Sequence, residues 1–410
     1  MRLLLFNCFL FKLALGCMCC CLSLGSGAKV FYMSYSDYTQ HEVNTSRMDI
    51  VSFLQQEKDR NARIRCIVKN FSVFDFSYIP NEPIMRQESK YLIKELTRFE
   101  ISGIPTHLAV IGTKGSGKTL TLKYLQSLLN VEGRLDIIYA NCREYNTTFK
   151  IFAHLLGVQA RGASLSELYD RFCQEHPGKT VVLLDEIDLM SAKDKNREIL
   201  YLLSRSKNPY MVIMLSNNYR FLQDLDMSTK STLQPVSIYF KSYDAAQIHN
   251  ILIQRAKQGL HKWDEGELSQ IAALTTRKTN SDARVAIKTL FYSVTKDSDD
   301  IEKCFEKARK DIVFDMIHDL SDSNLMILQA VATSKSDFAK EIYQRYRKIS
   351  LVYNDVPFSY VYFYSNLSCL QSMGLVALIA TKVGRTYANR VMLAFEKQVL
   401  ETVCKLRLNS

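Results

Sequence analysis

The chain lacks a cysteine pattern that could build a disulfide framework or a zinc site. It contains 11 cysteines, which crowd at the N-terminus or stand singly in apolar stretches. Small secreted domains instead place an even number of cysteines at close, regular spacings. The seven histidines do not fall near cysteines at zinc-ligand spacing. We therefore expect an intracellular protein in which Cys142 and Cys369 are buried thiols.

Apart from its beginning, the chain also lacks an apolar run of the roughly 18 residues that a membrane span requires. The run at 3–15 is interrupted by Asn7 and Lys12, and no clean small-residue cleavage motif follows it. A signal peptide, a membrane anchor and a later translation start are three open interpretations. We assign 1–32 as an N-terminal extension outside the working protein and 33–75 as a segment without a role, and we expect no stable membrane association.

The charge of the chain is unbalanced. Its net charge is +11 at pH 7, although only 23% of its residues are charged. A positive surface favours a polyanionic partner, and nucleic acid is the first candidate. An anionic membrane competes, but the basic residues are not gathered on one amphipathic helix with an apolar face. With 410 residues, the chain is long enough for two or three domains of roughly 100 to 200 residues each.

Residues 76–241 alternate between apolar, strand-like runs and helix-periodic segments. This alternation predicts an α/β domain with a parallel sheet that helices cover on both faces. The expected strands are Leu108–Ile111, Ile137–Ala140, Val181–Leu184, Met211–Leu215 and Val236–Phe240.

The remainder of the chain is mainly helical. Residues 242–298 contain three helical patterns without a strand, which predicts a small helical lid domain. From residue 299 a linker helix leads into three further helical segments and then two strand-like runs around Gly384. Helix, helix, helix and hairpin in this order predict a winged-helix domain over 299–410.

Residues 112–119 lie between a predicted strand and a predicted helix and fit the pattern of a phosphate-binding loop. The glycines of such a loop let successive backbone N–H groups turn toward the phosphates of a nucleotide. We expect Lys118 to reach the β- and γ-phosphates of ATP, and the hydroxyl of Thr119 to ligate Mg²⁺. The candidate nucleotide-binding residues are Gly112, Thr113, Lys114, Gly115, Ser116, Gly117, Lys118 and Thr119.

Asp185 and Glu186 follow the apolar run Val181–Leu184 directly. Parallel sheets bind ligands at the carboxyl ends of their strands, which places both carboxylates beside the loop. We expect Asp185 to hold Mg²⁺ and Glu186 to orient and deprotonate the attacking water. The alternative is a strand that ends in acidic helix-capping residues.

Two further residues are candidates for the reacting phosphate. Asn217 follows the strand Met211–Leu215 and could hold the γ-phosphate or the attacking water, although asparagine is also common in plain turns. Arg284 stands one turn into a helix of the lid and could swing over the γ-phosphate. A surface arginine is the alternative interpretation there.

The ordered motifs resemble the AAA+ DNA replication initiators of archaea, which are related to origin recognition complex subunit one and to cell division control protein 6. The resemblance runs over about 78–395 and includes Ala140-Asn141-Cys142-Arg143, a first sensor at Ser216-Asn217 and a second sensor at Asp282-Ala283-Arg284. It implies an AAA+ P-loop fold with a helical lid and a C-terminal winged helix, and ATP and Mg²⁺ as cofactors. It also implies a segment that packs near the adenine, with Tyr78, Ile79, Pro80 and Arg86.

The chain departs from that family at one position. Where the family usually has an arginine that acts on a neighbour's nucleotide, this chain has Ser228, and Lys230 is the cation nearby in the sequence. A lysine is a point charge on a flexible stem and replaces the planar guanidinium poorly. Because an arginine supplied in trans can contribute roughly 10³ to 10⁵ in rate, we expect slow hydrolysis of ATP.

The C-terminal unit has the charge of a DNA-binding domain. No Asp or Glu occurs at 356–395, and Lys382, Arg385 and Arg390 flank the turn of the predicted hairpin. The preceding helix carries aromatic residues but no Lys or Arg, so phosphate contacts and the wing should dominate affinity. The resemblance adds a second DNA contact in the sheet domain, where Lys150 is the basic residue.

These features predict a replication initiator that binds ATP and duplex origin DNA, in the cytoplasm on chromosomal DNA. Recruitment of the replicative helicase and association with other initiator subunits follow from the resemblance alone. Two alternatives stay open. One is a paralogous regulator that binds ATP and DNA and hydrolyses ATP weakly. The other is an AAA+ helicase loader whose winged helix contacts proteins.

We expect binding to duplex DNA to weaken steeply as salt rises, because bound lysines and arginines displace counterions. Replacing Arg385 with alanine should lower the slope of log K against log salt by about one. A salt titration of binding to duplex DNA measures this slope. A duplex interaction that is absent or independent of salt would favour the protein-contact alternative.

Overall fold

The computed structural model describes residues 50–131, 133, 135–159, 161–191, 194, 197–219, 221–295, 300–383 and 386–408. The N-terminal extension at 1–32, part of the segment at 33–75 and the predicted DNA contact Arg385 lie outside this set. Among the described residues, no helix combines the length and the apolar character needed to cross a membrane.

A five-stranded parallel sheet organises the first half of the described chain. Its strand order is β2-β3-β4-β1-β5, with every neighbouring pair parallel. The strands are β1 (Leu108–Gly112), β2 (Asp136–Asn141), β3 (Thr180–Asp185), β4 (Tyr210–Ser216) and β5 (Val236–Phe240). Every residue of β1, β3 and β4 is buried, which explains why these strands are continuous apolar runs in the sequence.

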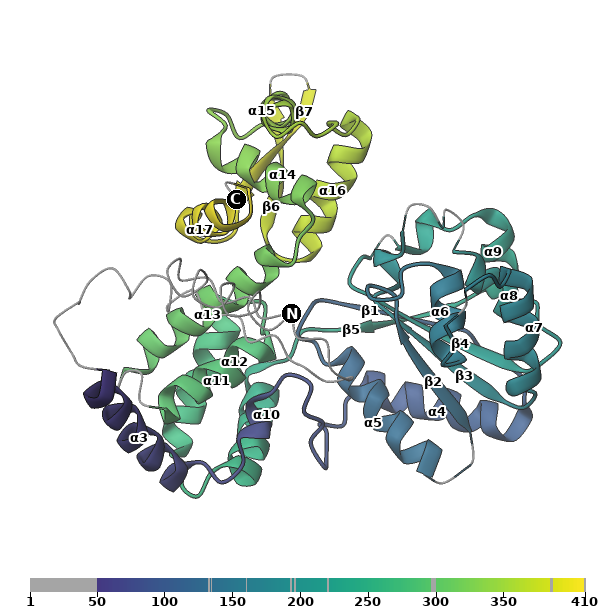
Figure 1. Ribbon diagram of the computed structural model, residues 1–410, viewed down its shortest axis with the longest axis horizontal. Helices are drawn as coiled ribbons and strands as arrows, with labels where there is room; N and C mark the ends of the chain where they lie inside the picture. The colour runs from purple at the N-terminus through teal and green to yellow at the C-terminus, as the bar shows by residue number, and fades with distance from the viewer. Residues whose placement is uncertain are drawn as a thin grey trace, which may run out of the picture.

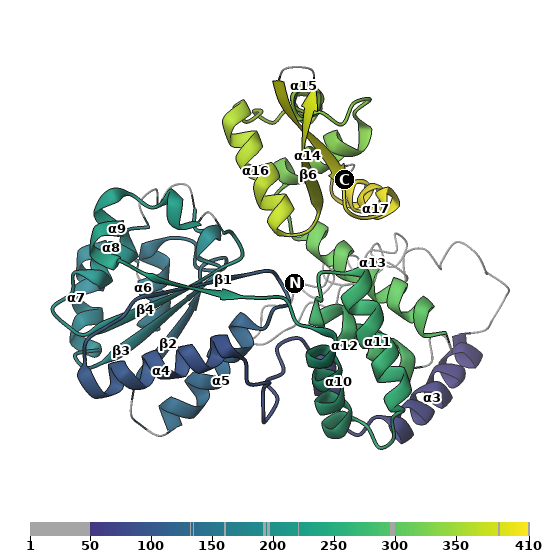
Figure 2. The same cartoon turned by 180° about the vertical axis from the view of Figure 1, so that it is seen from behind.

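Helices cover both faces of this sheet (Figures 1 and 2). Alternate strand residues point to opposite faces, so Ala109 packs into one core and Val110 into the other. The core with Val110 is closed by α4 (Gln87–Ser102) and α5 (Lys118–Val131). The helices over the other face are α6 (Thr148–Leu155), α7 (Leu165–Glu175), α8 (Glu198–Ser204) and α9 (Met227–Leu233).

The lid is a separate helical layer beside the sheet domain (Figure 1). It contains α10 (Ala245–Gly259), α11 (Glu265–Lys278), α12 (Ala283–Val294) and the first half of α13 (Ile301–His318). The segment before the sheet domain packs onto it. From this segment, α3 (Ile50–Ile67) contributes Ile64 and Ile67 to the lid core, the short helix η1 (Phe71–Phe74) contributes Phe74, and Val68 between them is also buried there.

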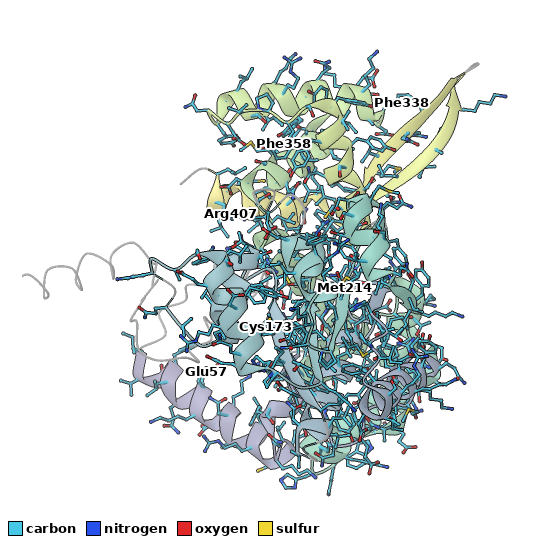
Figure 3. The ribbon with its side chains drawn as sticks, turned by 90° about the vertical axis from the view of Figure 1, so that its right-hand side faces the viewer. Glu57, Cys173, Met214, Phe338, Phe358 and Arg407 are labelled. Atoms are coloured by element: carbon cyan, nitrogen blue, oxygen red, sulfur yellow. The ribbon has the colours of Figure 1, made fainter. Side chains whose placement is uncertain are left out.

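The C-terminal unit is a winged helix with its own core (Figure 3). Its helices α14 (Asp322–Thr333), α15 (Ala339–Val352) and α16 (Tyr360–Ser372) precede an antiparallel hairpin of β6 (Val376–Val383) and β7 (Thr386–Leu393). A final helix, α17 (Lys397–Arg407), packs against α13. The predicted fold class, an AAA+ sheet and lid followed by a winged helix, is confirmed, while the predicted domain limits stay predictions.

The helix α13 belongs to two cores at once. Phe305 and Ile312 lie in the lid core, whereas Phe314 and Ile317 lie in the winged-helix core. One continuous helix therefore joins the lid to the winged helix, with its C-terminal turn at the junction.

Candidate nucleotide site

The candidate site is a cavity of about 560 Å³ at the carboxyl edge of the sheet. It lies between the loop after β1, the ends of β3 and β4, the lid, and the C-terminal turn of α13. A volume of this size lies within the range of roughly 300 to 1,000 Å³ that small-ligand pockets occupy. The cavity thus brings together parts of the chain that are distant in sequence.

The loop at 112–119 needs glycine for conformation and for close packing. Gly115 and Gly117 have φ values of +77° and +85°, a region that side chains other than glycine rarely adopt. A Cβ atom on Gly115 would collide with the carboxylate of Asp282 in the lid, and one on Gly117 with the hydroxyl of Tyr243. The lid therefore rests directly on the backbone of the loop.

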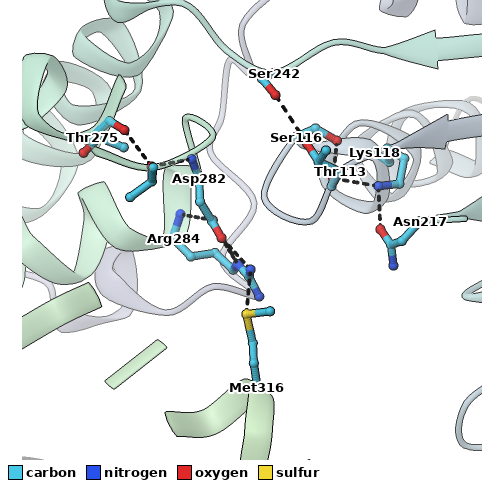
Figure 4. A network of polar contacts seen from close by, with 10 residues as sticks. Thr113, Ser116, Lys118, Asn217, Ser242, Thr275, Asp282, Arg284 and Met316 are labelled. Carbon is cyan, nitrogen blue, oxygen red and sulfur yellow. Dashed lines mark hydrogen bonds and ion pairs between the residues drawn. The ribbon is translucent and has the colours of Figure 1, made fainter. Parts of the chain in front are cut away.

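Lys118 is buried and aims into the loop. Its Nζ donates to the carbonyl oxygens of Gly112 at 2.8 Å and Thr113 at 3.0 Å, and to Oδ1 of Asn217 at 2.9 Å (Figure 4). Burial lowers the pKa of Lys118 to about 8. The structure thus unites Lys118 and Asn217, which the sequence analysis assigned separately to the phosphates.

Thr119 and Asp185 are also in contact, as a shared metal site requires. The hydroxyl of Thr119 donates to Oδ2 of Asp185 at 2.9 Å, and Asp185 is 5% exposed. No cluster of three or more His, Cys, Asp or Glu side chains suited to a metal occurs among the described residues. One carboxylate and one hydroxyl nevertheless fit Mg²⁺, because this ion keeps several waters and takes phosphate oxygens as its other ligands.

Tyr139 is a site residue that the sequence analysis missed. From β2, its hydroxyl donates to the same Oδ2 of Asp185 at 3.0 Å, and Lys123 lies 4.5 Å from its ring centre. Burial, followed by the charge of Asp185, raises the pKa of Tyr139. The hydroxyl is therefore a firm donor that helps to fix the orientation of the carboxylate.

Glu186 occupies a strained position directly after β3. Its φ of 52° lies in the left-handed region, and its N–H donates to Oδ1 of Asp185 at 2.9 Å. Burial, followed by the charge of Asp185, raises the pKa of Glu186, whereas Lys114 and Arg143 lower it. A raised pKa makes this carboxylate a better proton acceptor than an exposed one.

Arg284 lines the cavity from the lid but is held by a lid carboxylate. Its Nε lies 3.0 and 3.2 Å from the two carboxylate oxygens of Asp282, and its Nη2 contacts the same carboxylate and the sulfur of Met316 (Figure 4). Asp282 also caps α12 by accepting from the backbone N–H of Arg284 at 3.0 Å. Arg284 is therefore close to the phosphate side of the cavity without being free.

The segment with Tyr78, Ile79, Pro80 and Arg86 divides into lining and bracing residues. Pro80 lines the cavity, together with Phe76, Pro83 and Ile84, which the sequence analysis did not name. The hydroxyl of Tyr78 instead donates to Oε1 of Gln258 in the lid at 2.6 Å.

Arg86 is buried behind the phosphate-binding loop. It donates to the carbonyl oxygens of Ser116 at 3.0 Å and Lys241 at 2.7 Å, and its guanidinium lies over the ring of Tyr243. It therefore supports the loop from behind.

The candidate DNA contacts lie away from this cavity and differ in availability. Lys382 is exposed on β6, whereas Arg390 on β7 donates to Oδ2 of Asp337 at 2.5 Å. Lys150 in α6 donates to the side chain of Asn146 at 3.2 Å. Arg390 and Lys150 would therefore have to leave these partners to contact DNA.

Comparison with known proteins agrees with this geometry. The AAA domain family matches residues 105–221. An ORC1-type DNA replication protein of Desulfurococcus amylolyticus is 29% identical over 266 residues, which cover 60% of this chain and 66% of that protein. One from Picrophilus torridus is 26% identical over 350 residues, which cover 78% of this chain and 85% of that protein. The chain resembles the archaeal ORC1-type DNA replication proteins.

The ORC1-type resemblance extends to the fold. The structure of the Aeropyrum pernix ORC1 protein in complex with DNA matches 83% of this chain and 97% of that chain, with a TM-score of 0.62 and 22% identity. At this identity the match establishes the fold alone. Alignments span 66% and 60% of the length of the ORC1-type relatives from D. amylolyticus and Pyrococcus furiosus.

The shared contact at Asp185 generates a prediction for Tyr139→Phe. Loss of one hydrogen bond of about 0.5 to 1.5 kcal/mol should loosen the carboxylate and reduce the gain in ATP affinity that Mg²⁺ provides by about two- to tenfold. Titrations of ATP with and without Mg²⁺ measure that gain.

ATP affinity without Mg²⁺ should stay unchanged in Tyr139→Phe. Tyr124→Phe, which alters another tyrosine of the same sheet domain on α5, is the matched control and should behave as the native chain. An unaltered Mg²⁺ effect in Tyr139→Phe would remove Tyr139 from the metal site.

Proposed function

We propose that this chain is a DNA replication initiator of the ORC1 type that binds ATP with Mg²⁺ and uses its winged helix on duplex origin DNA. The observation that carries the proposal is the convergence of Lys118, Asp185, Asn217 and Arg284 on one cavity, in a chain that also has a winged helix. The names of its relatives and the DNA-bound A. pernix ORC1 protein support the role in replication.

Binding of ATP would involve an exchange of partners at Lys118. Its ammonium group now contacts two carbonyl oxygens and one amide oxygen, and phosphate oxygens with full negative charge would be stronger acceptors. Mg²⁺ held by Thr119 and Asp185 would neutralise charge on the β- and γ-phosphates. Phe76, Pro80 and Ile84 offer the apolar wall that an adenine ring requires.

Hydrolysis would depend on Glu186 and on the two sensors. Glu186 would accept a proton from the attacking water, and Asn217 would orient that water or the γ-phosphate. Arg284 would stabilise charge on the phosphate after leaving Asp282. On α9 Ser228 supplies no guanidinium for a neighbour, and Lys230 donates to the carbonyl oxygen of Gln223 at 2.9 Å. We therefore propose slow turnover, in which ATP acts mainly as a switch.

Binding of DNA would rest on the wing and on charge. Lys382, Arg390 and Arg385 would contact phosphates, with Arg390 leaving Asp337, and Lys150 would add a contact from the sheet domain. Phosphate contacts position a protein on DNA without reading its sequence, so DNA shape would contribute to the choice of site. Recruitment of the replicative helicase, association with other initiator subunits and a cytoplasmic place on chromosomal DNA are supported by the resemblance.

One observation favours a second function, that of an AAA+ helicase loader whose winged helix binds protein. The first turn of α16 exposes apolar surface, with Val361 80% and Tyr362 50% exposed. Apolar patches of this kind mark interaction sites on proteins. The salt dependence of duplex binding separates the two functions.

Lys118→Ala should abolish retention of ATP, because the ammonium group that faces the phosphates is lost. Equilibrium binding of a fluorescent ATP analogue measures this loss. Lys94→Ala, which removes an exposed lysine of α4 outside the cavity lining, is the control and should retain ATP. Native affinity in Lys118→Ala would contradict a phosphate-binding role of the loop.

Glu186→Gln should bind ATP as the native chain does but trap it, since the amide cannot accept the proton. The rate of phosphate release should fall roughly 10²- to 10⁴-fold, the contribution of a general base. Single-turnover assays measure that rate. Equal turnover in the variant would exclude Glu186 as the base.

A further inference from the structure

Arg143 is a cation of the cavity to which neither the motif analysis nor the resemblance gives a role. It follows β2 and lines the same cavity as Lys114 and Glu186. Its positive charge lowers the pKa of Lys114 and opposes the rise in the pKa of Glu186. The guanidinium is therefore near the end of the cavity where the general base and the terminal phosphate would meet.

The partner of Arg143 lies outside the sheet domain. Its Nη2 donates to the carbonyl oxygen of Asp319 at 3.0 Å and lies 3.3 Å from the Oδ2 atom of the same residue. Asp319 caps the C-terminus of α13 and also lines the cavity, as do Asp315 and Met316. The last turn of α13 is thus a wall of the nucleotide cavity.

The winged helix holds the same turn through a second arginine. Arg407 of α17 donates to the carbonyl oxygens of His318 at 2.7 Å and Leu320 at 2.6 Å, and pairs with Asp322. Arg407 lies at the border between the winged helix and the rest of the chain (Figure 3). Two arginines therefore hold one turn, Arg143 from the nucleotide cavity and Arg407 from the winged helix.

The contact between Arg143 and Asp319 is weak enough to be exchanged. The two side chains are 41% and 52% exposed, and an exposed ion pair changes an equilibrium by at most about fivefold. A terminal phosphate carries more charge than one carboxylate and accepts several hydrogen bonds from a guanidinium. A nucleoside diphosphate lacks the terminal phosphate and so could not replace Asp319 as the partner of Arg143.

We propose that Arg143 is a triphosphate-sensing residue that exchanges Asp319 for the terminal phosphate of a bound nucleoside triphosphate and so releases the turn that carries the winged helix. The inference rests on the proposed nucleotide site. It assigns to Arg143 the discrimination between triphosphate and diphosphate, and to Asp319 the role of the competing anion. By thermodynamic linkage, binding of the terminal phosphate would favour release of the turn, and release of the turn would favour binding of the phosphate by the same factor.

A double-mutant cycle tests the exchange with the non-hydrolysable analogue AMP-PNP and with ADP, each with Mg²⁺. Arg143→Ala should weaken AMP-PNP roughly tenfold and leave ADP unchanged. Asp319→Asn should tighten AMP-PNP by about two- to fivefold, because it removes the competing negative charge while the backbone carbonyl oxygen stays, and should also leave ADP unchanged. The double variant should match Arg143→Ala, since Asp319 acts only through Arg143.

Glu396→Gln is the matched control. It removes the negative charge that pairs with Lys310, at 2.9 Å, in another ion pair between α13 and the winged-helix unit, and should not change the ratio of the two affinities. A second readout is hydrogen exchange at 314–322, which should be faster with AMP-PNP than with ADP in the native chain and equal in Arg143→Ala.

The outcomes separate the inference from the proposed function. If the native chain binds neither nucleotide, the nucleotide site itself fails. If it binds both, but Asp319→Asn weakens AMP-PNP or changes both affinities equally, the ion pair has only a structural role. The proposed exchange of Asp319 for the terminal phosphate is then wrong. Equal hydrogen exchange with both nucleotides in the native chain would also overturn it.

Discussion

The nucleotide site depends on the ammonium group of Lys118, a residue that is only 7% exposed. A charge removed from water must find polar partners within the protein. Two carbonyl oxygens of the loop and the side chain of Asn217 meet this need. These partners come from the ends of β1 and β4, which are neighbours in the sheet. The parallel strand order is thus what makes a buried cation tolerable, and the cation keeps the site ready for a stronger anion.

The lid also contributes a polar side chain to the residues around the loop. Its Asp282 lies against the backbone of Gly115 and also binds Arg284, so the loop, the lid and the second sensor meet at one carboxylate. Only a glycine allows this approach, because any Cβ on Gly115 would occupy the position of the carboxylate. The lid is therefore in direct contact with the loop that would hold the phosphates.

The sequence was sufficient for those parts of the site whose chemistry is local. A glycine-rich loop before a helix, and two carboxylates after an apolar strand, have few other uses, so Lys118 and Asp185 could be named without coordinates. Tyr139 could not, because a tyrosine in a strand reads as a core residue until its contact with Asp185 is seen. The role of Arg86 as a brace was also hidden, since it depends on carbonyl oxygens 30 and 155 residues away.

The fold shows the same division between local and distant causes. Apolar periodicity predicts the five strands and the three lid helices, because burial imposes it along each element. The packing of α3 and η1 onto the lid, and of α17 onto α13, has no local signal in the sequence. Both contacts follow from complementary apolar faces that are distant in sequence.

The role inferred for Arg143 also depends on a distant contact, since its partner is Asp319 at the end of α13. Two of the arginines that line the cavity, Arg143 and Arg284, are held by carboxylates in the described structure. Under the proposed function, Ser228 offers no guanidinium to a neighbour's nucleotide, and these two exchanges would let the chain register a bound triphosphate in the lid and in the winged helix.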